Sequence, residues 1–121
     1  VPGTDSPGAA TFEKMATAAG FKSGPFAPES YDAAALMIMA MQAAKSTDSQ
    51  AFKGKVMSVA NAPGQKIFPG ELGKALKIIA GGGDVDYVGA SAVELIGAGE
   101  SAGNYKEILV KGGKNTTVRF R

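Results

Sequence analysis

The sequence contains no histidine and no cysteine among its 121 residues. Without these two residue types the chain cannot form zinc fingers, cysteine–histidine nucleophilic pairs, serine–histidine–aspartate triads or imidazole-ligated transition-metal sites. Disulfides are also impossible, which leaves both reducing and oxidising compartments open. The missing residues therefore exclude much of the enzyme chemistry that a small domain can carry.

Concentrated charge and long hydrophobic runs are missing too. Thirteen Lys and Arg residues against eleven Asp and Glu residues give a formal charge of +2 with no basic stripe, so nucleic acid is not an expected partner. The longest apolar stretch, Ala33 to Met41, is far shorter than the roughly twenty residues that span a bilayer. The N-terminal segment Val1 to Gly8 does not resemble a signal peptide, so we expect a removed leader or a piece of a longer protein.

Two helices are predicted in the first half of the chain. Ser6 and Pro7 supply a cap and a proline at the first helical position, and apolar residues then recur at helical spacing until Gly20. A second helix is predicted from Pro28 to about Lys45. Because this second helix has almost no polar face, it must be covered on most sides.

Two further helices and a group of strands follow. Thr47 or Asp48 can cap a third helix that runs to Asn61, and a fourth is predicted between Pro69 and the three glycines that begin at Gly81. The remaining extended segments are Ala92 to Ile96 and a C-terminal β-hairpin formed by Tyr105 to Lys111 and Thr116 to Arg121 around Gly112 and Gly113. The pattern predicts a mixed α/β class with too few strands to shelter so much apolar helix.

The glycine run Gly97, Gly99 and Gly103 invites comparison with a dinucleotide-binding loop. The third glycine comes one position late, and a strand is expected where such a loop requires a helix. A plain glycine turn is therefore favoured, and a nucleotide-binding enzyme fragment remains an alternative that a helix after Gly103 would support.

Asp84, Asp86 and Gly89 resemble the opening of a calcium loop, but Leu95 occupies the position where the bidentate acid is expected. We therefore expect no metal and no cofactor.

Short sequence words carry a more specific signal. In order along the chain they are Ser23-Gly24-Pro25-Phe26, Ser30-Tyr31-Asp32-Ala33-Ala34, Phe68-Pro69-Gly70-Glu71-Leu72, Ile78-Ile79-Ala80-Gly81-Gly82, Asp84-Val85-Asp86-Tyr87 and Gly89-Ala90-Ser91. This series resembles the C-terminal third of the periplasmic branched-chain amino-acid-binding proteins, the type I solute-binding components of ABC transporters. The chain departs from them between Ala92 and Glu100, where the usual aspartates are absent.

The resemblance implies a fold and a function. Members of the family are about three times as long and form two α/β lobes with parallel sheets, which close on a ligand like a Venus flytrap. Residues 1–121 would then be a single incomplete domain, with most of its sheet supplied by an upstream portion. The implied protein is periplasmic and not an enzyme, and it delivers an amino acid or a similar small carboxylate to an ABC transporter permease.

The resemblance also implies two site residues. Phe26 matches the phenylalanine that walls the aliphatic part of the ligand in the family, and Tyr31 belongs to a word that lies near the cleft. The groups that bind the charged ends of the ligand come from segments that this chain does not contain, so we expect the chain alone not to bind. A second alternative is a structural or oligomerising α/β module that completes its sheet as a homodimer.

Overall fold

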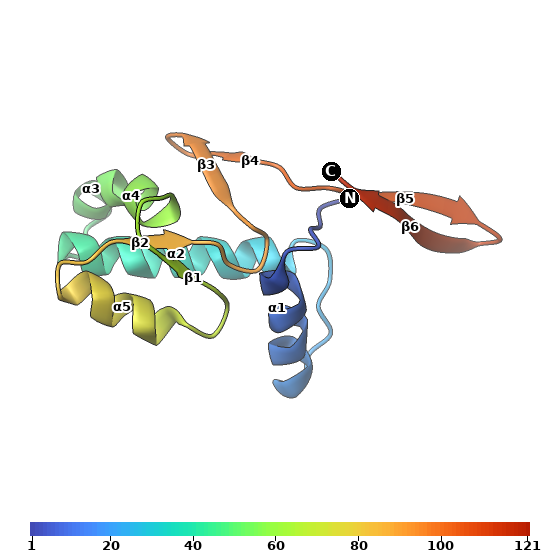
Figure 1. Cartoon of the computed structure of the whole chain (residues 1–121), viewed down its shortest axis with the longest axis horizontal. Helices are drawn as coiled ribbons and strands as arrows, with labels where there is room; N and C mark the ends of the chain where they lie inside the picture. Colours follow the sequence, from blue (N-terminus) through green and yellow to red (C-terminus); the bar gives the residue numbers. More distant parts are fainter.

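The structure, a computed structural model, describes residues 1–121 and is a mixed α/β arrangement of helices and short strands (Figure 1). A helical body occupies one end, and a long hairpin projects from the other. The helices are α1 (Pro7–Ala18), α2 (Ala27–Ala44), α3 (Ser49–Phe52), the 3-10 turn η1 (Lys53–Lys55), α4 (Val56–Ala60) and α5 (Leu72–Ala80). The strands are β1 (Gln65–Ile67), β2 (Val85–Tyr87), β3 (Glu94–Gly97), β4 (Glu100–Ala102), β5 (Lys106–Lys111) and β6 (Lys114–Phe120). No helix has the length and apolar content needed to cross a membrane.

The first two helices confirm the sequence prediction. Pro7 stands at the first position of α1, and after its last turn the Phe21 N–H donates to the Ala16 carbonyl at 3.1 Å. Helix α2 begins at Ala27, one residue before the predicted start, and ends where Lys45 adopts a left-handed conformation (φ 53°). Left-handed residues commonly close a helix because they redirect the chain while its last carbonyls stay bonded.

The third predicted helix is broken. The Asp48 side chain caps α3 by accepting a hydrogen bond from the Gln50 N–H at 2.9 Å, as the sequence suggested. The chain then tightens into η1 around Gly54 before α4 ends at Ala60. Glycine in a helix interior is unfavourable because it gains no side-chain packing and loses much backbone freedom, which explains the interruption.

Strands β1 and β2 are the main elements that the sequence prediction missed. They pair in parallel, with Ile67 opposite Tyr87, and α5 connects them. Asp84 lies just before β2, and Asp86 lies within it. A two-stranded parallel sheet is unusual because such sheets are normally wider and buried on both faces.

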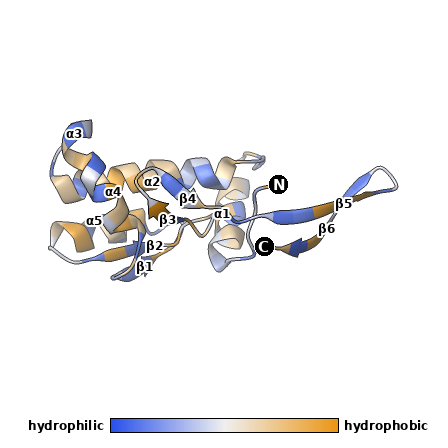
Figure 2. Ribbon diagram, turned by 90° about the horizontal axis from the view of Figure 1, so that it is seen from above, coloured by the Kyte–Doolittle hydropathy of each residue, from blue (hydrophilic) through white to orange (hydrophobic).

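The core lies between one face of α2 and this small sheet. From α2 it takes Ala35, Leu36, Met39 and Ala40, and from the other elements Phe52, Val59, Ala60, Ile67, Ala75, Val85 and Tyr87. The face of α2 formed by Ala33, Ala34, Met37 and Ile38 stays exposed, and Met37 and Ile38 retain 48% and 42% of their accessible surface. Figure 2 shows hydrophobic colouring along much of this helix and hydrophilic colouring in part of it.

The C-terminal hairpin confirms the prediction, except that β6 starts at Lys114, two residues early. Gly112 and Gly113 both have positive φ (58° and 73°), as the tight two-residue turn requires. Glu107 accepts hydrogen bonds from Arg119 at 2.7 Å and Arg121 at 3.1 Å, and these guanidinium groups hold the pKa of its carboxyl below the ordinary value. Every residue of β6 is exposed.

Three chain segments run side by side where the helical body meets the hairpin. Pro2 forms an antiparallel bridge with Tyr105, and the Lys106 N–H donates to the Val1 carbonyl at 2.8 Å. Tyr105 also exchanges two backbone hydrogen bonds with Arg121. Few other contacts tie the hairpin to the body, so this junction sets how the two regions face each other (Figure 1).

Candidate functional site

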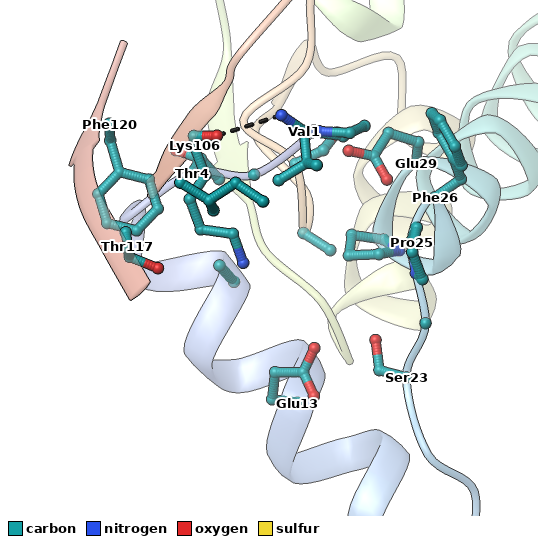
Figure 3. A pocket seen from close by; sticks show the side chains of 18 of the residues that line it. Val1, Thr4, Glu13, Ser23, Pro25, Phe26, Glu29, Lys106, Thr117 and Phe120 are labelled. Atoms are coloured by element: carbon teal, nitrogen blue, oxygen red, sulfur yellow. Dashed lines mark hydrogen bonds between the residues drawn. The ribbon is translucent and has the colours of Figure 1, made fainter. Parts of the chain in front are cut away.

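A cavity of about 640 Å³ lies between the helical body and the hairpin. Its walls come from the N-terminal segment, the exposed side of α1, the connector before α2, the loop after β2, and strands β5 and β6. Figure 3 shows Glu13, Pro25, Phe26 and Glu29 on the body side, with Lys106, Thr117 and Phe120 on the hairpin side. This size suits a small organic molecule.

Phe26 is one of the residues that line the cavity. It precedes α2 in a left-handed conformation (φ 67°, ψ 2°), and its side chain is 61% exposed. It lines both this cavity and a smaller one of about 190 Å³ beside it. A non-glycine residue in this region costs about 1 kcal/mol or more, and such strain concentrates at functional sites. The position is compatible with the wall role that the sequence predicted for Phe26, and that role stays a prediction.

Tyr31 has a different setting. Its ring lies 5.3 Å from that of Phe12, and its hydroxyl accepts a hydrogen bond from the Gly70 N–H at 3.1 Å. It is not among the residues that line the cavity. Tyr31 therefore ties α1 and the turn before α5 to α2, and its predicted ligand contact stays a prediction.

Asp32 is the most connected polar side chain of the molecule, and it is 1% exposed. Its Oδ1 accepts from the Tyr87 hydroxyl and the Ala90 N–H, both at 2.8 Å. Its Oδ2 accepts from the Ser91 N–H at 2.7 Å and from the Ser91 hydroxyl at 2.5 Å. Four donors satisfy this buried carboxylate, so Asp32 fixes the loop after β2 against α2.

The same network places two cavity residues. Ala90 and Ser91 line the cavity, and Asn104 donates from Nδ2 to the carbonyls of Ser91 and Ala92, both at 3.0 Å. Burial raises the pKa of the Tyr87 phenol, and the nearby Asp32 carboxylate raises it further, so Tyr87 remains a proton donor to Asp32. Asp32 and Asn104 therefore hold the loop of Ala90 and Ser91 from two sides, where it lines the cavity.

Close backbone packing supports this loop. A side chain at Gly89 would collide with Asp32 and the Tyr87 ring, and one at Gly8 would collide with the Gly89 carbonyl. Both positions are buried. The start of α1 therefore sits directly on the loop that Asp32 holds.

Sequence reasoning missed Asp32 and Glu29 as site residues. Asp32 had a signal, since it is a carboxylate inside an apolar helix and must find partners when it is buried. Glu29 resembles an ordinary acidic residue in the first turn of a helix, a type that stabilises the helix N-terminus. Only the structure shows that Glu29 lines both cavities.

Other candidate motifs do not form sites. The glycine run folds into the β3–β4 hairpin, and strand β5 follows it, so the helix that a dinucleotide-binding loop requires is absent. No group of three or more acidic side chains comes together in a way that could hold a metal ion.

No family model, no curated protein and no solved structure matches the chain.

Proposed function

We propose that residues 1–121 form the C-terminal portion of an extracytoplasmic, two-lobed solute-binding protein. This protein captures an amino acid or a similar small carboxylate and presents it to the permease of an ABC importer. The cavity between the helical body and the hairpin carries the proposal, because both regions contribute walls to it. The order of the short sequence words, from Ser23-Gly24-Pro25-Phe26 to Gly89-Ala90-Ser91, supports the proposed family.

Two features of the fold support an incomplete two-lobed protein. The parallel pair β1–β2 has the βαβ connection of a wider parallel sheet, yet it stands alone in this chain. The β5–β6 hairpin is likewise a separate two-stranded unit, and such hairpins are at best marginally stable in water. In the proposed protein each pair packs with strands supplied by the rest of the protein.

The proposed mechanism is capture by closure. A ligand that touches both lobes stabilises the closed state by its differential contacts, and the permease recognises that state. Such a closing motion would bend the chain at the junction between the helical body and the hairpin. This junction is formed by Val1 to Gly3, Asn104 to Lys106 and Arg121. Energy for transport would come from the ATPases of the importer.

Replacing Phe26 tests the proposal in the full-length protein. Phe26→Ala should weaken binding of an aliphatic amino acid by roughly 1 to 3 kcal/mol, or about 5- to 150-fold, because the ligand loses the aromatic surface that it would bury on binding. Calorimetry with L-leucine measures the change. Phe21→Ala is the matched control, since Phe21 is 50% exposed and lines neither cavity. Equal affinity in both variants would show that Phe26 does not contact the ligand. Absence of binding by the unmodified protein would contradict the proposed function.

A second candidate is the oligomerising module, favoured by the exposed apolar face of α2 at Met37 and Ile38. It predicts a mass that rises with concentration in analytical ultracentrifugation of the 121-residue chain, and no ligand for the full-length protein. A constant monomer mass would argue against it.

A further inference from the structure

Asn104 is bonded to the helical body at the point where the chain leaves it for the hairpin. Its side-chain Nδ2 atom donates to the carbonyls of Ser91 and Ala92, both at 3.0 Å, so both N–H groups of the amide are used. Its backbone carbonyl accepts a hydrogen bond from the Gly3 N–H at 3.1 Å. One partly buried residue thus holds the cavity loop and the N-terminal segment of the junction together.

The carbonyls that bind Asn104 belong to a loop that is fixed to the core. The backbone N–H and the hydroxyl of Ser91 both donate to the buried Asp32 carboxylate. The N–H of Val93 donates to the carbonyl of Val88 at 3.2 Å, which closes the loop on itself. Hydrogen bonds to an ionised acceptor are the strong ones, so the loop is a firm support for the Asn104 side chain.

The chain after Asn104 has no such support. No hydrogen bond or ion pair joins residues 105–121 to residues 4–104, and the hairpin is bonded only to itself and to Val1. Figure 1 shows the hairpin projecting away from the body. The polar contacts to the core therefore stop at Asn104, and the freely bending part of this segment begins directly after it.

We infer that the Asn104 side chain holds the backbone at position 104 on the helical body, so that closure bends this segment only after Asn104. The inference rests on the proposed function, because it concerns the movement that closes the cavity. Gly103 lies directly before Asn104, and a glycine has no side chain to restrict its backbone. If the amide released the loop, Gly103 would join the hinge. A ligand that closes the cavity would then have to order this additional freedom, and its binding would weaken.

The test compares hinge freedom and affinity in the full-length protein carrying Asn104→Asp. This substitution keeps the shape of the side chain but replaces its donor with an acceptor, so both hydrogen bonds to the loop are lost. Spin labels on Lys14→Cys in α1 and Lys111→Cys in β5, both exposed positions, report the distribution of distances between body and hairpin without ligand. Asn104→Asp should broaden this distribution. In calorimetry it should weaken L-leucine binding roughly five- to thirtyfold, the factor expected for ordering one more backbone residue.

Asn61→Asp is the matched control. The Asn61 Nδ2 atom donates to the Leu95 carbonyl at 2.7 Å, so the same substitution removes a similar hydrogen bond inside the body and away from the junction. It should leave both the distance distribution and the affinity unchanged. Asn104→Ala removes the donors without adding charge, and it replaces Asn104→Asp if that variant has a lower thermal midpoint than the control.

The possible outcomes separate the hinge from the function. An unchanged distribution, equal broadening in the Asn61 control, or a broadened distribution with unchanged L-leucine affinity overturns the role of Asn104 and leaves the proposed function standing. Failure of the unmodified protein to bind L-leucine contradicts the proposed function, and the distance distribution alone then decides whether Asn104 restrains the hinge.

Discussion

The helical body and the C-terminal part of the chain reach their structures in different ways. All 18 buried residues lie between Gly8 and Ala90, and none lies in the last 31 residues. The body therefore has its own apolar core, whereas β5 and β6 depend on backbone pairing and on exposed side chains. Exposed ion pairs such as those of Glu107 contribute little to stability.

This difference shows which part of the chain requires additional packing to be stable. Apolar side chains of the hairpin, including Leu109, Val110 and Val118, remain exposed. A hairpin of this kind becomes stable when a larger sheet or a helix covers it. In the two-lobed protein that we propose, the region without a core would meet the second lobe. The cavity lies between this region and the region that is already packed.

The largest expected effect comes from removing the buried carboxylate of the body. Asp32→Ala should lower the free energy of unfolding by about 4 kcal/mol, because the hydroxyls of Tyr87 and Ser91 and two backbone N–H groups lose their acceptor inside the protein. Urea denaturation of the 121-residue chain followed by circular dichroism measures the loss. Asp48→Ala, which removes an exposed helix cap, should cost about 1 kcal/mol. A cost for Asp32 no greater than that for Asp48 would show that the network does not hold the body together.

The sequence was sufficient for the long helices and the last hairpin. Pro7, Pro28 and Gly20 mark helix ends by backbone chemistry that acts within a few residues, and Gly112-Gly113 specifies its turn in the same local way. The sequence also predicted a mixed α/β class, which the structure confirms.

Other features depend on contacts between distant residues and could not be predicted locally. Strands β1 and β2 have three residues each, and Gln65, Lys66 and Asp86 do not look like a buried strand. They become strands because Ile67 and Tyr87 pack under α2 while the backbones pair. The partners of Asp32 lie 55 or more positions away along the chain, so no spacing rule could reveal them. The placement of Glu29 has the same origin, because hairpin residues far away in the sequence complete its cavity.

Equivalent truncations in the two regions test the comparison directly. Met39→Ala should cost about 3 kcal/mol because Met39 is fully buried in the core. Leu109→Ala, in the exposed part of β5, should change the free energy of unfolding by less than about 0.5 kcal/mol in the same chain. Urea denaturation compares the two variants under identical conditions. A large cost at Leu109 would mean that the hairpin has a core of its own, through association or through a closer approach to the body.

Raising the pH above 10 should destabilise the helical body through Tyr87 and should not act on the hairpin in the same way. Burial raises the pKa of Tyr87 above the ordinary value of 10.0, so above pH 10 the unfolded chain loses this proton while the folded chain keeps it. The unfolded state then binds fewer protons, and stability falls as the pH rises. Between pH 10 and pH 11 the Tyr87 contribution to this fall should be about 1 kcal/mol. Denaturation curves at the two pH values, compared between the unmodified chain and Tyr87→Phe, isolate that contribution from the titration of the lysines.

Tyr87 lies in the core and not at the hairpin. Amide exchange in α2 and β2 of the unmodified chain should therefore accelerate relative to Tyr87→Phe, before any such difference between the two proteins arises in β5 and β6. Equal pH dependence in the two proteins would mean that Tyr87 is not held as a buried donor to Asp32.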